Sequence, residues 1–109
     1  MQQTDAFVVL LTTVPDANTG ERLAKGLIDQ EFAACINLLP AMTSFYKWQG
    51  KVECDSEQQL LIKTRRNKID AIEQWLTDHH PYDVPELITL PISDSSQDYL
   101  QWLNDSIKL

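Results

Sequence analysis

The chain has 109 residues, 43 % of them apolar, which predicts a single domain, residues 1–109, with a buried core. Its net charge of −7 at pH 7 argues against nucleic-acid partners, which are bound through clustered Lys and Arg. No apolar stretch approaches the ~20 residues that cross a bilayer, and residues 1–5 lack the basic region of a signal peptide. We therefore expect a cytoplasmic protein with neither a nucleic-acid nor a membrane partner.

The N-terminal part of the chain predicts a strand followed by a helix. Residues 6–13 are a continuous apolar, β-branched run that Pro15 ends, which is typical of a central strand buried on both faces. Asp16 is a suitable N-cap for a helix through about residue 31. Gly20 and Gly26 each lower helix propensity by ~1 kcal/mol relative to Ala, so packing must stabilise this helix. Its expected apolar face is Leu23, Leu27, Ile28 and Phe32.

The middle of the chain predicts one very long β-hairpin. Residues 33–48 and 51–64 are rich in strand formers, and Gln49-Gly50 between them is a tight-turn signal. Pro40 lacks an N–H group and is expected at an edge or a bulge. Fourteen strand residues extend ~46 Å, whereas a compact chain of this size is about 34 Å across. The hairpin should therefore project beyond its own domain.

The projecting arms carry Phe45, Tyr46 and Trp48, and such a two-stranded ribbon is marginally stable in water. We expect it to pack on further copies of the chain, because closed homo-oligomers commonly bury such surfaces. The alternative is that Pro40 folds the ribbon back.

Two cysteines are present, in no CxxC or zinc-finger spacing. In the predicted hairpin Cys54 lies opposite Phe45, ~33 Å along the strand from Cys35. A disulfide needs Cα atoms within ~7 Å, so we expect two free thiols.

The C-terminal part predicts a helix, a strand and a helix. Asn67 is the expected cap of a helix that ends before Pro81. Residues 86–92 form a short strand between prolines, and Ser95 with Asp98 is a capping-box pattern for the last helix.

The order of elements indicates an α+β fold. It is a ferredoxin-like β-α-β-β-α-β sandwich with an added C-terminal helix and a long protruding β-hairpin. The right-handed crossover rule places the first and third strands side by side in the centre of the sheet.

The residues richest in chemistry lie between the second helix and the last strand. His79 and His80 precede a loop with Tyr82, Asp83 and Glu86, stiffened by prolines. Imidazoles and thiolates suit copper or zinc, and carboxylates can complete the coordination shell. The alternative is that both histidines only end a helix. Phosphate-loop, GxSxG and HExxH motifs are absent. A Cys–His nucleophilic pair is an alternative, but the sequence identifies no third group to orient it, so we expect no enzyme.

Five ordered segments carry a family resemblance: residues 32–37 (FAACIN), 44–51 (SFYKWQGK), 62–64 (IKT), 79–87 (HHPYDVPEL) and 99–103 (YLQWL). Together they resemble the CutA divalent-cation tolerance proteins over about residues 7 to 104. The resemblance implies a ferredoxin-like homotrimer, with long hairpins packed between subunits and a cytoplasmic role in tolerance of copper and other divalent metals. That trimer is also similar to the PII signalling architecture.

Carried over residue by residue, the resemblance implies a metal or ligand cleft that uses His79 and His80, with Cys35 and Glu57 nearby. Some family members have a cysteine where this chain has Thr12. A hydroxyl is a poorer copper(I) ligand than a thiolate, so the affinity for soft metals should be reduced.

Two functions follow as hypotheses. The first is a homotrimeric protein that binds copper, or another divalent cation such as zinc, through His79 and His80 without turnover. The second is a PII-like sensor or adaptor that binds a small anion in clefts between subunits. Its candidate anion-binding residues, which are otherwise an ordinary solvated face, are Lys63, Arg65, Arg66 and Lys68.

Overall fold

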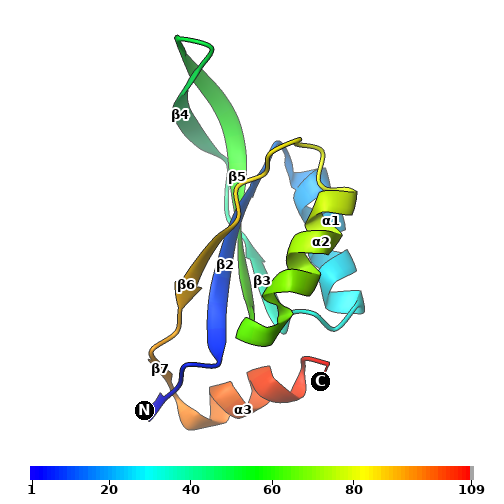
Figure 1. Ribbon diagram of the computed structural model, residues 1–109, viewed down its shortest axis with the longest axis vertical. Helices are drawn as coiled ribbons and strands as arrows, with labels where there is room; N and C mark the ends of the chain where they lie inside the picture. The colour runs from blue at the N-terminus through cyan, green and yellow to red at the C-terminus, as the bar shows by residue number, and fades with distance from the viewer. Residues whose placement is uncertain (109) are drawn as a thin grey trace.

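The computed structural model describes residues 1–108; Leu109, the last residue of the predicted domain, lies outside them (Figure 1). The elements in chain order are β1 (Gln2–Gln3), β2 (Phe7–Val14), α1 (Ala17–Asp29), β3 (Cys35–Leu38), β4 (Met42–Trp48), β5 (Lys51–Arg65), a 3₁₀ turn (Arg66–Lys68), α2 (Ile69–His79), β6 (Ile88–Pro91), β7 (Asp94–Ser95) and α3 (Gln97–Asp105). None of the described helices is long and apolar enough to cross a membrane.

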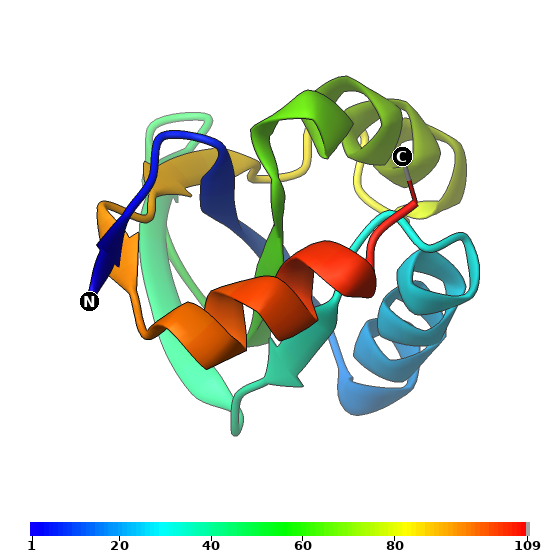
Figure 2. The same cartoon turned by 90° about the horizontal axis from the view of Figure 1, so that it is seen from below.

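The main sheet is antiparallel, with strand order β3-β5-β2-β6, and β4 pairs with the outer part of β5. The two central strands, β2 and β5, are the first and third long strands in the chain, as predicted. Helices α1 and α2 cover one face of the sheet, and α3 crosses the end farthest from the hairpin (Figures 1 and 2). This is the expected ferredoxin-like α+β fold with an added helix.

The core lies between this sheet and the two covering helices. Along β2, alternate residues point toward the helices and are fully buried, as period-2 side-chain alternation requires. On the helix side the core consists of Val8, Leu10, Val14, Leu23, Leu27, Leu60, Ile62, Ile72 and Leu76, with Ala33.

The other face of the sheet carries apolar side chains, and none of the described helices covers most of its length (Figures 1 and 2). Ile88 and Leu90 in β6 are 46 % and 45 % exposed. They share this face with Val9 and Leu11, their register partners in β2. The protein therefore has an open apolar sheet face.

The hairpin projects from the domain as predicted, and the chain measures 46 Å along its longest axis (Figure 1). Gln49 and Gly50 both have positive φ, the conformation of a two-residue hairpin turn. Pro40 lies in the break between β3 and β4, whereas β5 runs unbroken for 15 residues. The ribbon is therefore interrupted on one strand only.

The strand register also shows how far apart the two cysteines lie. Cys54 pairs with Phe45, as expected, while Cys35 pairs with Lys63 far along β5. Both thiols are free.

Two capping predictions are wrong. Asn67 lies within the 3₁₀ turn, and α2 begins at Ile69 without a side-chain cap. Ser95 lies in β7, where its backbone pairs with Gln2. The N-cap residue of α3 is therefore Ser96. The cap at Asp16 is confirmed, because its carboxylate accepts the Thr19 N–H at 2.8 Å.

Candidate functional site

His80 is a buried residue that follows the end of α2, with an extended backbone imposed by Pro81. Its Nε2 lies 2.8 Å from the Thr13 carbonyl oxygen, and its Nδ1 accepts the Tyr82 N–H at 3.1 Å. These partners assign the proton to Nε2, because a carbonyl only accepts and an amide N–H only donates. Both ring nitrogens are therefore occupied within one chain, and neither presents a lone pair to a metal.

The environment of His80 keeps its ring neutral. Burial is the largest influence and lowers the pKa of His80 below its ordinary value, and the charge of Arg22 acts in the same direction. The hydrogen bond to Thr13 and the charge of Glu57 oppose the shift but do not reverse it.

His79 is the last residue of α2 and has an exposed side chain. Its ring stacks on Trp75 at a centroid distance of 4.0 Å, and its Nδ1 lies 2.7 Å from the Trp75 carbonyl oxygen. Nδ1 is therefore the protonated nitrogen, and Nε2 keeps its lone pair. Histidine ligands of metals commonly donate their other N–H to a backbone carbonyl in this way.

Glu57 lies on β5 and is joined to the loop after α2. The Tyr82 hydroxyl donates to its Oε2 at 2.8 Å, and the Tyr82 ring contacts His80 at a centroid distance of 4.9 Å. Burial and this hydrogen bond raise the pKa of Tyr82, so the hydroxyl stays protonated at neutral pH. The structure thus brings Glu57, Tyr82 and His80 together.

Cys35 lies away from this group. It pairs with Lys63 on β5, whereas Glu57 pairs with Met42, and six residues of strand separate these positions by about 20 Å. Within residues 1–108, no three His, Cys, Asp or Glu side chains are close enough to hold a metal ion. The four predicted ligands therefore do not form one metal centre in a single chain.

Thr12, the residue for which the family resemblance suggested a cysteine in some members, is fully buried. Its Oγ1 makes no hydrogen bond to the described residues. It lies on the helix side of β2, with Leu10 and Val14, rather than on the open face.

A cavity of about 510 Å³ lies between the hairpin and the loop after α2. Glu57, Tyr82, Asp83 and Glu86 line it, together with two groups that sequence reasoning did not assign to a site, Tyr46 and Asp55, and with Thr13, Trp48 and Val84. The Tyr46 hydroxyl donates to Asp55, and this bond is the main cause that raises the pKa of Tyr46 to about 12.

The alternation of residues along β5 could have identified Tyr46 and Asp55 from the sequence. Glu53, Asp55 and Glu57 occupy alternate positions of β5, and Tyr46 is the register partner of Glu53. Alternate residues of a strand share one face, so the sequence places these acidic groups beside a tyrosine.

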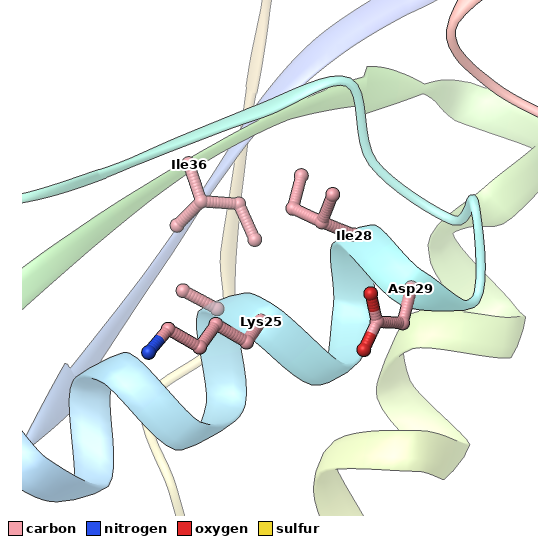
Figure 3. Close-up of a pocket in the computed structure, with 5 residues that line it drawn as sticks. Lys25, Ile28, Asp29 and Ile36 are labelled. Atoms are coloured by element: carbon pink, nitrogen blue, oxygen red, sulfur yellow. The ribbon is translucent and has the colours of Figure 1, made fainter.

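A smaller hollow of about 290 Å³ lies between α1 and β3 (Figure 3). Lys25, Ile28 and Asp29 of α1 line it, facing Ile36. Ile28, which was expected on the apolar face of the helix, is partly exposed there. The described lining contains no His or Cys, so this hollow does not gather the predicted ligands.

Two of the basic residues near the end of β5 make hydrogen bonds to other segments of the fold. Arg65 is buried and donates to Asn104, and the Arg66 Nε donates to the Asp5 carbonyl at 3.2 Å. Both guanidinium groups therefore attach other segments to the end of β5.

Comparison with known sequences places the chain among characterised families. A family model described as CutA1 divalent ion tolerance protein matches residues 8–106. The divalent-cation tolerance protein CutA of Pectobacterium atrosepticum is 46 % identical over 101 residues, which are 93 % of this chain and 92 % of that protein. The chloroplastic CutA of Arabidopsis thaliana is 42 % identical over 101 residues, again 93 % of this chain. The chain spans only 56 % of the Arabidopsis protein and 57 % of a chloroplastic CutA 1 from Oryza sativa.

Solved structures agree with the sequence comparison. CutA1 from Oryza sativa superposes with a TM-score of 0.93 at 42 % identity, covering 98 % of both chains. CutA from Synechococcus elongatus gives a TM-score of 0.94 at 36 % identity, covering 98 % of this chain and 95 % of that one. With the family model matching nearly the whole chain, this protein belongs to the CutA1 divalent ion tolerance family.

Proposed function

We propose that this chain is a divalent-cation tolerance protein that acts as a homotrimer and binds copper, or another divalent cation such as zinc, without chemical turnover. The observation that carries the tolerance role is membership of the CutA1 family over residues 8–106. A relative that the chain covers almost end to end, in Pectobacterium, is named for the same role.

His79 is the predicted ligand that the geometry supports best. Its exposed ring presents the Nε2 lone pair, while the Trp75 carbonyl and ring hold its orientation. His80 can bind a metal only after losing a hydrogen bond to Thr13 or Tyr82. Cys35 and Glu57 stay candidates for contacts that involve a second copy of the chain, because one chain does not bring them together.

The open apolar sheet face supports the proposed assembly. Partly exposed Ile88 and Leu90, beside Val9 and Leu11, form a surface that association would remove from water. The projecting hairpin adds Phe45, which is 71 % exposed. The number of copies, three, is proposed from the family resemblance.

A titration with copper and with zinc against a competing chelator, on fully reduced protein of known oligomeric mass, tests the metal assignment. We expect His79→Ala to weaken binding by at least about tenfold, since it removes the available nitrogen. Gln74→Ala, on the same helix and without an imidazole, is the control. Unchanged affinity in His79→Ala would reject His79 as a ligand.

The anion-binding alternative has no specific support in the described residues. Two of its four basic side chains are held by Asn104 and Asp5, and the largest of the cavities described above is lined by carboxylates.

We also propose a cytoplasmic location, in keeping with the two free thiols. Fractionation of cells with an antibody to the protein tests it, and recovery in an organelle would contradict it.

A further inference from the structure

The orientation of the His79 ring depends on Trp75, one turn earlier on α2. The two rings stack with 14° between their planes and 4.0 Å between their centroids. The His79 Nδ1 lies 2.7 Å from the Trp75 carbonyl oxygen, which directs Nε2 outward. An exposed imidazole without such contacts samples several rotamers, and a bound ligand must select one of them. The position of the indole ring therefore fixes the direction of the Nε2 lone pair.

The position of the Trp75 ring depends in turn on Gly26 in α1. A Cβ added at Gly26 would lie 2.6 Å from Trp75 Cη2 and would also meet Cζ2. Real Cβ atoms are essentially never found so close to another atom, so any larger residue at this position forces the indole to shift. Because His79 stacks on the same indole, such a shift alters the stack.

A second contact from α1 reaches the backbone of His79. Arg22 precedes Gly26 by one turn, on the same side of α1. Its Nη1 donates to the His79 carbonyl at 3.2 Å, and this carbonyl is one of the last of α2, which have no partners within the helix. These residues all belong to α1 and α2, on the face of the sheet opposite the open one (Figures 1 and 2). None lies on the hairpin or the open sheet face, which the proposed assembly would cover.

We propose that α1 positions the metal ligand His79, with Gly26 as a positioning residue that acts through the Trp75 ring. The inference rests on the proposed role of His79 as a metal ligand and adds to that site a residue from another helix. A divalent cation binds more tightly to an imidazole that is already oriented, because less rotamer freedom is lost on binding. Arg22 also carries a charge that repels a bound cation, so Gly26 is the residue that isolates the positioning effect.

Titration of copper and zinc against a competing chelator, on assembled protein at a temperature where every variant is folded, tests the proposal. We expect Gly26→Ala to weaken metal binding by about threefold to tenfold, the loss expected when one more side chain must be ordered on binding. Gly20→Ala is the matched control on the same helix, because its added Cβ would meet Leu38 rather than Trp75. It should bind metal as the parent does.

Proton NMR of the metal-free protein gives a readout that a loss of stability alone would not move. The chain has two histidines, so His79→Ala assigns the imidazole resonances. The stacked indole shifts the His79 ring protons upfield. Gly26→Ala should move these resonances and Gly20→Ala should not. Unmoved resonances in Gly26→Ala would overturn the proposal.

Trp75→Phe tests the route of the effect, because a phenyl ring is shorter than indole and lacks the Cζ2 and Cη2 atoms that the added Cβ would meet. In this background Gly26→Ala should weaken metal binding by less than about twofold. A loss as large as in the parent background would contradict a route through the indole. Unchanged affinity in His79→Ala would reject the metal assignment, and this proposal with it. Loss of binding in His79→Ala with parental binding in Gly26→Ala would overturn the positioning role alone.

Discussion

At the scale of single residues, His80 illustrates how two neighbouring histidines acquire different roles. The sequence places both histidines before Pro81 and gives no reason to assign them different roles. In the fold, the extended backbone at His80 turns its ring inward, where it joins the Thr13 carbonyl to the Tyr82 amide. His79 is still helical and stays at the surface. His79 is the last residue of α2 and His80 is its C-cap, and shared metal ligation stays a prediction.

His80→Ala should lower the free energy of unfolding by about 2–4 kcal/mol, because it leaves a buried N–H and a buried carbonyl without partners. His79→Ala, at the exposed neighbouring site, should cost about 1 kcal/mol or less. Urea denaturation at equal protein concentration measures both values. Equal losses in the two variants would contradict the structural role of His80.

The same residue should make stability depend on pH. The folded pKa of His80 is lowered from 6.5, so below pH 6.5 the unfolded chain binds a proton that the native chain does not. Stability from this group is full above pH 6.5 and falls as the pH decreases toward the folded pKa. Between about pH 7.5 and 5.5 the parent should lose more stability than His80→Ala, which lacks the group. Parallel curves from denaturation at several pH values would refute this assignment.

At the scale of elements, the packing of α1 on α2 explains a helix that its composition disfavours. Gly26 faces the Trp75 ring so closely that an added Cβ would lie 2.6 Å from Cη2. Stacking on His79 limits how far that ring can move. The sequence predicts that packing must compensate for the two glycines, but it does not identify the partner, because α1 and α2 are separated by the entire hairpin.

Gly26→Ala should lower the free energy of unfolding by about 1–3 kcal/mol, although alanine is the better helix former, because the tryptophan must shift. Gly20→Ala is the matched comparison: its added Cβ would lie 2.8 Å from Leu38 Cδ1, at the flexible end of a side chain. Gly20→Ala should therefore change the free energy of unfolding less than Gly26→Ala does. Thermal unfolding of both variants checks the order, and a stabilised Gly26→Ala would show that the contact relaxes freely.

At the scale of the whole molecule, the sheet face without a covering helix and the projecting hairpin both leave large apolar side chains exposed. Alternation along β2 and β6 predicts which residues share a face, yet the long apolar run suggests burial on both faces. Within one chain only the helix side is fully buried. The second face is the one that association would cover.

Leu90→Asp should therefore reduce the mass of the protein in solution from three chains toward one, since assembly would bury an unpaired charge. Asn18→Asp introduces the same side chain on exposed α1, away from this face, and should leave the assembly intact. Light scattering after size exclusion measures both. A fully assembled Leu90→Asp variant would remove the open sheet face from the proposed interface.

The sequence by itself determined the order of elements, the central strand pair, the Gln49-Gly50 turn and the projecting hairpin, because these depend on local periodicity, proline positions and turn chemistry. Only the tertiary structure decided which candidate ligands meet. It brings Glu57 close to Tyr82 and His80. It places Cys35 beside Lys63, about 20 Å along β5 from Glu57. It also adds Tyr46 and Asp55 to the lining of the cavity. The reason is that side-chain proximity depends on the register between strands and on the path of the loop after α2, which residues far apart in the chain set together.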